Sequence, residues 1–200
     1  MNNKRIFSEI YDKKAWVEGS GPGSTIEYCI PLIVFLSGYI KENNIKSMVD
    51  IGCGDIQWMS NIFNNLNISY TGIDVVDNVI NINKGNYPNE TFICADIFTM
   101  DIGDIPDSDM YFMKDVLQHW TNDMIQTWLD RFFEEKPNAH FLTINCDLDN
   151  ILKFMPEHSH DRELKVGEFS PLNKNKYPLS NYKPIELFSW ETKKVYRITK

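Results

Sequence analysis

The sequence has few cysteines, no long uninterrupted apolar run and fewer basic than acidic residues, and each shortage excludes a class of protein. Its four cysteines form no CxxC pair, which argues against a disulfide framework or zinc site and favours buried free thiols. The longest apolar stretch, residues 28–40, is interrupted by Pro31 and falls short of the roughly 20 residues that cross a bilayer. The first 14 residues lack the apolar core of a signal peptide, so we expect a cytoplasmic protein without a membrane partner.

Positive charge is also scarce, with 20 Lys and Arg residues against 28 Asp and Glu residues and a net charge of −8. Because nucleic-acid binding depends on neutralised phosphates, this balance disfavours a nucleic-acid partner and favours a small, neutral or sugar-like one. The 200 residues suffice for one domain with a sizeable core, and the apolar fraction of 42% is typical of a globular protein. The composition leaves the oligomeric state open.

From residue 46 onward, short apolar runs alternate with longer amphipathic segments. Their periodicity predicts strands and helices in alternation. The predicted strands are residues 47–51, 68–73, 91–94, 109–113 and 139–144, and the predicted helices are residues 57–66, 75–83 and 123–133. This alternation is typical of an α/β fold, in which a mostly parallel sheet carries helices on both faces.

The two ends of the chain differ from this pattern. Ser24 and Glu27 have the spacing of a capping box and open a helix to about residue 41, in which Pro31 predicts a kink or a late start. Residues 185–190 and 194–198 read as an antiparallel hairpin.

We therefore predict one domain with four parts. They are an N-terminal cap and helix (1–44), a ligand-binding core (46–145), a long loop insertion expected to contact a second bound molecule, the acceptor (146–183), and a C-terminal hairpin (184–200).

Residues 48–55 (MVDIGCGD) carry the strongest motif, a buried strand that runs into a glycine pair. Gly52 and Gly54 allow a sharp turn and close approach to a ligand, although a tight turn without a ligand has the same pattern. Gln57 stands where a dinucleotide fingerprint needs a third small residue, which disfavours a pyrophosphate. Asp74, 22 residues after Gly52, suits ribose hydroxyls. A ribose without a pyrophosphate fits S-adenosyl-L-methionine.

Four segments in order, VDIGCGD, GID, CADI and MKDVLQHW, resemble class I S-adenosylmethionine-dependent methyltransferases over residues 46–145. The resemblance implies a Rossmann-like fold with a seven-stranded, mostly parallel sheet whose last strand is antiparallel. It also implies S-adenosyl-L-methionine as cofactor and S-adenosyl-L-homocysteine as product.

The same resemblance assigns roles to individual residues. The Gly52–Gly54 loop would pass the methionyl part, Asp74 would hold the ribose, and Asp96 with Ile97 would meet the adenine. Lys114 would lie on the sulfonium side through its backbone. The cofactor-binding residues implied in this core are Asp50, Gly52, Cys53, Gly54, Trp58, Asp74, Val75, Asp96, Ile97 and Lys114.

A narrower pattern, FSxIY, SGxGS, DIGCGDxxW and DVLQH, is similar to a subgroup of small methyltransferases. Some of its members look like glycan-modifying enzymes, including sugar O-methyltransferase domains of large DNA viruses. This likeness implies that the segment around residues 16–24 covers the cofactor and adds Gly23 and Ser24 to the cofactor-binding residues. A flexible lead into the following helix explains the same residues equally well.

Asp115 and His119 follow the fourth predicted strand and are the candidate catalytic residues. If a helical turn follows the strand, their four-residue spacing places both on one face. A carboxylate next to an imidazole would then supply a base for a hydroxyl acceptor. In the alternative interpretation, Asp115 caps the turn and His119 packs against it.

Other polar clusters favour structural interpretations. Asp147 and Asp149 are expected to cap a turn after the fifth strand, and His140 lies at the wrong end of that strand for catalysis. Glu157 is followed by His158, His160 and Asp161. This cluster is more typical of a solvated loop than of a metal site, so no metal is expected.

The leading hypothesis is an S-adenosylmethionine-dependent methyltransferase that O-methylates a sugar, a glycan or another small hydroxyl acceptor. One alternative is an N-methyltransferase of a small metabolite or protein, whose site needs a carboxylate to orient the amine but no strong base. Another is a non-catalytic S-adenosylmethionine-binding domain, because fold alone does not establish chemistry.

Overall fold

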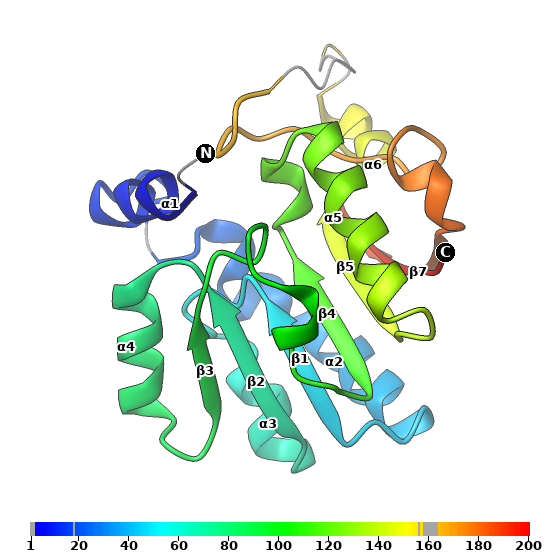
Figure 1. Cartoon of the computed structure of the whole chain (residues 1–200). Coiled ribbons are helices and arrows are strands. Elements are labelled where there is room, and N and C mark those ends of the chain that lie inside the picture. The colour runs from blue at the N-terminus through cyan, green and yellow to red at the C-terminus, as the bar shows by residue number, and fades with distance from the viewer. Residues whose placement is uncertain (1–2, 18, 156, 158–163) are drawn as a thin grey trace. The chain divides into compact units, whose positions relative to one another are not determined.

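The computed structural model describes residues 3–17, 19–155, 157 and 164–200. Its seven strands form a sheet in the order β3-β2-β1-β4-β5-β7-β6, shown in part in Figure 1. Parallel pairs occupy one side of this order and antiparallel pairs the other, which confirms the predicted mostly parallel, Rossmann-like sheet. The chain divides into two compact units, Met1–Met100 with Asp107–Met110, and Asp101–Pro106 with Tyr111–Lys200.

The first unit contains the N-terminal helices and the three strands β1, β2 and β3. Its elements are α1 (Asn3–Asp12), the 3-10 helix η1 (Pro22–Ser24), α2 (Ile26–Glu42), β1 (Ser47–Ile51), α3 (Ser60–Leu66), β2 (Ser69–Asp74), α4 (Asp77–Asn86) and β3 (Thr91–Cys94). The strands are parallel, with Ile51 opposite Ile73 and Asp74 opposite Cys94. Their carboxyl ends therefore meet at one edge, where open α/β sheets bind ligands.

Helix α2 begins one residue later than the predicted capping box. Its N-cap is Thr25, whose hydroxyl accepts a hydrogen bond from the Tyr28 amide at 3.3 Å, and not Ser24. The helix continues through Pro31 to Glu42. Pro31 is the sixth residue of the helix and has no amide to bond the Glu27 carbonyl, so the helix lacks one internal hydrogen bond there without starting late.

The described residues include one helical stretch, Pro22–Glu42, that is long and apolar enough to cross a membrane by length and composition. Sequence reasoning missed this property because it considered only the apolar residues 28–40 and not the whole helical stretch. It is weak evidence, since core helices pass the same test, and α2 buries Cys29, Leu32 and Leu36. A cytoplasmic location stays a prediction.

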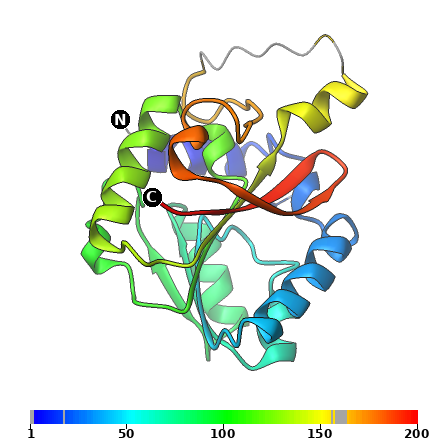
Figure 2. The same cartoon turned by 90° about the vertical axis from the view of Figure 1, so that its right-hand side faces the viewer.

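The second unit contains the four strands β4, β5, β6 and β7. Its elements are η2 (Ile102–Asp104), β4 (Met110–Lys114, whose first residue belongs to the first unit), η3 (Leu117–His119), α5 (Asn122–Glu135), β5 (Phe141–Cys146), α6 (Leu148–Phe154), η4 (Leu179–Tyr182), β6 (Ile185–Trp190) and β7 (Lys193–Ile198). Strands β4 and β5 are parallel, and β7 pairs antiparallel with both β5 and β6. Figure 2 shows the β6–β7 hairpin, in orange to red, alongside β5.

Helix α5 confirms the strongest periodic pattern of the sequence. Thr121 caps it by accepting a hydrogen bond from the Met124 amide at 3.2 Å. All six apolar positions that the period of 3.6 predicted are buried: Met124, Ile125, Trp128, Leu129, Phe132 and Phe133. Trp128 stacks on Phe132 and also contacts Phe141 of β5, so these aromatic rings fix α5 on the sheet.

The region 146–183, predicted as one long loop, contains two helical elements, α6 and η4. Asp147 caps α6 by accepting a hydrogen bond from the Asn150 amide at 3.2 Å, as expected for a capping aspartate. Asp149 instead accepts a bond from the Asn173 side chain at 2.8 Å. The short α6 escaped detection because seven residues are too few to establish a helical period.

Candidate functional site

The glycine loop after β1 has the conformation that the motif predicts. Gly52 and Gly54 have φ values of 75° and 58°, which side chains with a Cβ rarely adopt. The amides of Gly52 and Cys53 both donate to the Ile73 carbonyl, at 2.8 and 3.0 Å. These two bonds turn the chain sharply at the end of β1 and hold the loop against the end of β2.

Gly54 is fixed by two polar side chains. Its amide donates to Asp74 Oδ2 at 3.0 Å, and its carbonyl accepts a hydrogen bond from Asn83 Nδ2 at 2.8 Å. Asn83 lies on α4 and is only 1% exposed, so this bond is shielded from water. The sequence analysis missed Asn83, because an asparagine at the end of a predicted helix carries no distinguishing signal.

Asp74 ends β2 and orients the surrounding backbone. Its Oδ1 accepts from the Val76 amide at 2.9 Å, and Oδ2 accepts from Gly54. Burial raises the pKa of Asp74, while the amides of Val76, Gly54 and Val75 oppose that rise. Each carboxylate oxygen has two lone pairs, so the bonds from Gly54 and Val76 leave capacity for the ribose hydroxyls that the resemblance assigns to Asp74.

Asp50, Trp58 and Cys53 support the loop from within the first unit. The buried Asp50 carboxylate accepts from the Tyr70 hydroxyl at 2.8 Å, which ties β1 to β2. Trp58 is buried, and burial raises the pKa of the Cys53 thiol. These environments suit residues that position the loop, and direct contact of any of the three with a cofactor stays a prediction.

Asp96 lies two residues beyond the end of β3, at the same edge as Asp74. Its Oδ1 accepts from the Phe98 amide at 3.1 Å and from Asn3 Nδ2 at 3.0 Å. Ile97, the predicted adenine neighbour, is buried beside it. The Asp96 carboxylate thus has the Asn3 side chain as an additional partner, and its contact with adenine stays a prediction.

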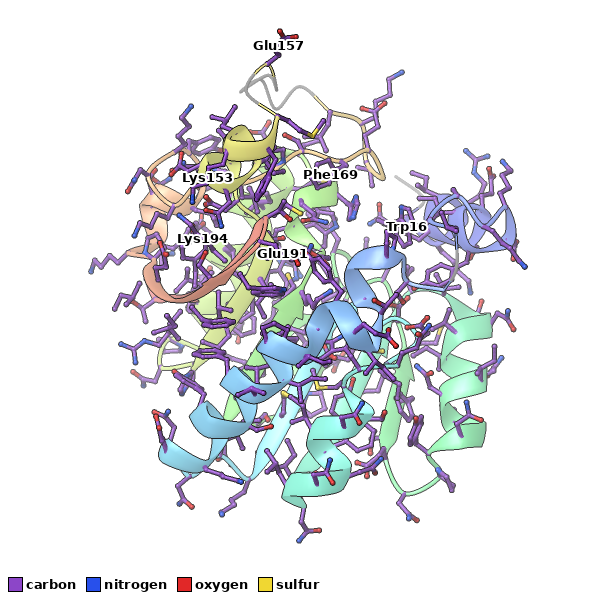
Figure 3. The ribbon with its side chains drawn as sticks, turned by 180° about the vertical axis from the view of Figure 1, so that it is seen from behind. Trp16, Lys153, Glu157, Phe169, Glu191 and Lys194 are labelled. Atoms are coloured by element: carbon purple, nitrogen blue, oxygen red, sulfur yellow. The ribbon has the colours of Figure 1, made fainter. Side chains whose placement is uncertain are left out.

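The segment after α1 is bonded to the glycine loop through Ser20. The Ser20 amide donates to Asp55 Oδ2 at 3.0 Å, and the Asp55 amide donates to Ser20 Oγ at 3.0 Å. The Ser20 and Tyr11 hydroxyls share a hydrogen bond at 2.7 Å. Trp16, labelled in Figure 3, packs against the Tyr11 ring with 5.6 Å between centroids. We call residues 16–17 and 19–20 the N-terminal strap.

Gly23 and Ser24, which the narrower likeness adds to the cofactor-binding residues, lie in η1 directly before α2, and their contact with a cofactor stays a prediction. There the Gly23 carbonyl accepts a weak bond from the Cys29 thiol at 3.4 Å. The residue that bonds the glycine loop is Ser20, the first serine of the quoted SGxGS pattern. Asp55 is held further by the Gln57 side chain, which donates to its Oδ2 at 2.8 Å.

In the second unit, Asp115 follows β4 and bonds two lysines. Lys114 Nζ lies 2.7 Å from Asp115 Oδ2, and Lys193 Nζ lies 2.5 Å from Asp115 Oδ1. Although burial raises the pKa of Asp115, the two ammonium groups outweigh it and lower the pKa to about 2. The sequence analysis missed Lys193 because it placed the residue in the turn of the hairpin, whereas β7 begins there, opposite Cys146 of β5.

The predicted pairing of Asp115 with His119 was wrong. It assumed an α-helical turn, but Asp115 has a φ of 60° and residues 117–119 form a 3-10 helix. His119 Nδ1 lies 3.1 Å from the Glu168 carbonyl oxygen, and its Nε2 lies 3.5 Å from Gln118 Nε2. Because a carbonyl oxygen only accepts, this geometry assigns the proton to Nδ1 and leaves Nε2 as the acceptor nitrogen.

The chain segment that carries Glu168 is itself fixed to η3. The Gly167 amide donates to the His119 carbonyl at 3.1 Å, and the Ser170 amide donates to the Gln118 carbonyl at 3.0 Å. The Phe169 ring lies 6.4 Å from the imidazole of His119 between centroids. Backbone contacts therefore set the orientation of His119, and no sequence pattern pointed to them.

Asp147 has further partners at the end of β5. Tyr196 donates to its Oδ2 at 2.6 Å, and Lys194, labelled in Figure 3, lies 3.2 Å from its Oδ1. Burial and the bond to Asp147 raise the pKa of Tyr196. These contacts, together with the hydrogen bond that caps α6, give the Asp147 carboxylate a structural role.

The remaining predictions concern metals and histidines. Within residues 3–17, 19–155, 157 and 164–200, no group of three or more His, Cys, Asp or Glu side chains could hold a metal ion. His158, His160 and Asp161 lie outside the described residues, and Glu157 is exposed. His140 precedes β5, and its carbonyl accepts from the Tyr111 amide at 2.9 Å. Burial lowers the pKa of His140.

Comparisons with known proteins fit this arrangement. Residues 49–135 match the family described as "Methyltransferase domain". A search of curated proteins found no match. The methyltransferase domain of bacterial CtHen1-CN is a similar solved structure, with 13% identity, coverage of 84% of this chain and 97% of that chain, and a TM-score of 0.64.

Two further solved structures cover almost the whole chain. Magnesium protoporphyrin IX methyltransferase from Synechocystis PCC 6803, with bound S-adenosylhomocysteine, is 12% identical, with 98% and 100% coverage and a TM-score of 0.63. Human N-acetylserotonin methyltransferase, in complex with S-adenosylmethionine, is 15% identical, with a TM-score of 0.61. The match covers 98% of this chain and 59% of the human chain.

The fold is the Rossmann-like fold that solved methyltransferase structures share. Residues 49–135 match a methyltransferase domain, and similar structures hold S-adenosylmethionine or S-adenosylhomocysteine. The first unit suits such a cofactor chemically, because the carboxylates of Asp74 and Asp96 would accept hydrogen bonds from its hydroxyl and amine groups. The similar structures are named for different substrates, so the fold leaves the acceptor open.

Proposed function

We propose that the chain is an S-adenosylmethionine-dependent methyltransferase that transfers a methyl group to a hydroxyl oxygen of a sugar, a glycan or another small molecule, with His119 as the general base. The observation that carries the proposal is the contact between His119 Nδ1 and the Glu168 carbonyl. A histidine whose Nδ1 donates to a carbonyl presents an unprotonated Nε2, which is the form that accepts a hydroxyl proton. The acidic net charge of −8 supports a neutral acceptor over a polyanionic one.

The bound cofactor supplies a methyl carbon that its sulfonium already activates. The protein then has to align the acceptor oxygen and remove its proton. In this proposal His119 Nε2 takes the proton of the acceptor hydroxyl, which replaces the 3.5 Å contact of this nitrogen with Gln118 Nε2. The cofactor would supply the methyl group and leave as S-adenosylhomocysteine. The imidazolium formed keeps its hydrogen bond to the Glu168 carbonyl.

Asp115 contributes by position in this proposal and not as the base. A carboxyl group with a pKa of about 2 has little tendency to accept a proton at neutral pH. Its two oxygens bond Lys114 and Lys193, and Lys193 also donates to the Cys146 thiol at 3.3 Å. We infer that Asp115 orders these lysines at the carboxyl ends of β4 and β5.

A His119→Gln variant tests the base directly. Glutamine keeps a polar side chain but cannot take up the proton, so we expect kcat to fall by about 10²–10⁴-fold with little change in the acceptor KM. His140→Gln is the matched control, because His140 lies at the opposite end of β5 and should leave kcat unchanged.

Two outcomes would contradict the proposal. Undiminished transfer to an oxygen acceptor by the His119 variant would show that another group removes the proton. Transfer to amine acceptors, retained in that variant and absent for every hydroxyl tested, would identify the enzyme as an N-methyltransferase of a small metabolite or protein.

A further inference from the structure

The first described residue of α1, Asn3, contacts Asp96, the residue to which the resemblance assigns the adenine. Its side-chain Nδ2 donates to Asp96 Oδ1 at 3.0 Å, across 93 positions of the sequence. Asn3 is 3% exposed, although the next two residues of α1, Lys4 and Arg5, are exposed. Asparagine side chains are mostly exposed in proteins, so the burial of Asn3 against Asp96 calls for a physical cause.

The other polar atom of this amide is an acceptor without a donor. Among the described residues, no hydrogen-bond partner reaches the buried Asn3 Oδ1. Buried polar atoms of this kind are rare, because water is lost without a replacement bond. A ligand that brings a donor to this position would remove the cost. The observation therefore points to a donor group beside Asp96.

Independent contacts hold the start of α1 in this place. Lys4 Nζ lies 2.5 Å from Asp77 Oδ2 on α4, and the Cys94 thiol donates to Asp77 Oδ1 at 2.9 Å. The Lys4–Asp77 pair is exposed and contributes little by itself. At the other end of α1, Tyr11 bonds Ser20 of the N-terminal strap. These contacts fix α1 at both ends, so the position of Asn3 does not depend on its own amide alone.

We propose that Asn3 determines cofactor specificity by accepting a hydrogen bond from the exocyclic amine of adenine. That amine carries two hydrogens, and Asp96 and Asn3 together present a carboxylate and an amide oxygen. Asn3 Nδ2 meanwhile stays on Asp96, which keeps the amide oriented. A purine with a carbonyl in place of the amine would bring a second acceptor oxygen against the Asp96 carboxylate and the Asn3 amide oxygen. Such a purine is therefore rejected. The proposal rests on the cofactor and on the adenine role of Asp96, and is independent of the methyl acceptor.

Calorimetric binding of two ligands tests the proposal without measuring turnover. The ligands are S-adenosylhomocysteine and its deaminated analogue S-inosylhomocysteine, which carries the carbonyl. In Asn3→Ala we expect affinity for S-adenosylhomocysteine to fall about tenfold, because one buried hydrogen bond is lost. Affinity for S-inosylhomocysteine should stay within about twofold of the wild-type value. The preference for the amine should therefore shrink by about the same tenfold factor.

Three controls separate adenine recognition from a general effect on α1. Asn3→Leu keeps much of the side-chain volume without polar atoms, and it should reproduce the change in preference if the alanine variant is unstable. Lys4→Ala loosens α1 at the adjacent residue and should weaken both ligands equally. Asn78→Ala, at an exposed asparagine of α4, should change neither affinity.

The proposal is overturned if both Asn3 variants weaken the two ligands by the same factor, which would make Asn3 a structural contact only. It is also overturned if S-adenosylhomocysteine binds the variants as tightly as it binds the wild type. Neither result would bear on whether the methyl acceptor is a hydroxyl, since no acceptor is present.

Discussion

Two aspartates that end parallel strands are held in opposite electrostatic environments. Backbone amides surround Asp74, and burial raises its pKa. Two lysine ammonium groups surround Asp115 and lower its pKa to about 2 despite its burial. The sequence marks both as acidic residues after a strand, but the lysine partner from β7 lies 78 positions away in the chain. Sequence reasoning therefore located both carboxylates but could assign a role by resemblance only to Asp74.

The ion pairs of Asp115 predict a measurable dependence of stability on pH. In Asp115→Asn two buried ammonium groups lose their counter-ion, and we expect about 3 kcal/mol of destabilisation at pH 7. The carboxyl pKa is about 2 in the folded protein and ordinarily about 3.9 in an unfolded chain. Its stabilisation is therefore present above about pH 4 and is lost as the pH falls toward 2.

Urea unfolding of the wild type and Asp115→Asn at pH 7 and pH 3 measures this contribution. The difference in free energy of unfolding between the wild type and Asp115→Asn should be smaller by about 1 kcal/mol at pH 3 than at pH 7. Asp12→Asn, at an exposed aspartate of α1, is the control and should change stability by less than about 0.5 kcal/mol. A difference for Asp115→Asn that is small at pH 7, or that grows in acid, would contradict the assigned ion pairs.

At the scale of elements, hydrogen bonds join the N-terminal strap to the glycine loop, the predicted cofactor-binding segment. The helices with a clear period and the strands with continuous apolar runs were predictable, because burial of one face dictates their pattern. The strap was predictable only as a glycine-rich segment near the cofactor. Its hydrogen bonds between Ser20 and Asp55 join residues 35 positions apart, which no local pattern encodes.

A methyl group at Gly54 should disrupt that contact. A Cβ there would lie 2.3 Å from Ser20 Oγ, and the φ of 58° is strained for alanine. We expect Gly54→Ala to lower the free energy of unfolding by about 1–3 kcal/mol and to weaken S-adenosylmethionine binding. Thermal unfolding and calorimetry measure the two effects.

Gly38→Ala supplies the matched control for this substitution. Gly38 lies in α2, and a Cβ there meets nothing within 4 Å. Alanine is a better helix former than glycine, so the free energy of unfolding of this variant should rise by about 0.4–1 kcal/mol. Its affinity for the cofactor should equal that of the wild type. Equal stability and affinity for Gly54→Ala and the wild type would refute the close strap contact.

At the scale of the whole molecule, the mostly parallel sheet and the cofactor class were the most predictable features. Alternating strands and helices indicated the parallel sheet, and four motifs in sequence resembled one class of enzyme. The acceptor side was less predictable. His119 acquires its tautomer from the carbonyl of Glu168, 49 residues away, and the spacing of Asp115 and His119 suggested a different geometry.

The central claim is that this enzyme methylates a hydroxyl oxygen. The most direct measurement incubates the protein with S-adenosylmethionine and a panel of nucleotide sugars, glycosides and small amines, and locates the transferred methyl group by mass spectrometry and nuclear magnetic resonance. We predict S-adenosylhomocysteine release above background together with a methyl ether on a hydroxyl-bearing acceptor, both lost in His119→Gln. Methylated amines without any methylated hydroxyl would contradict the claim.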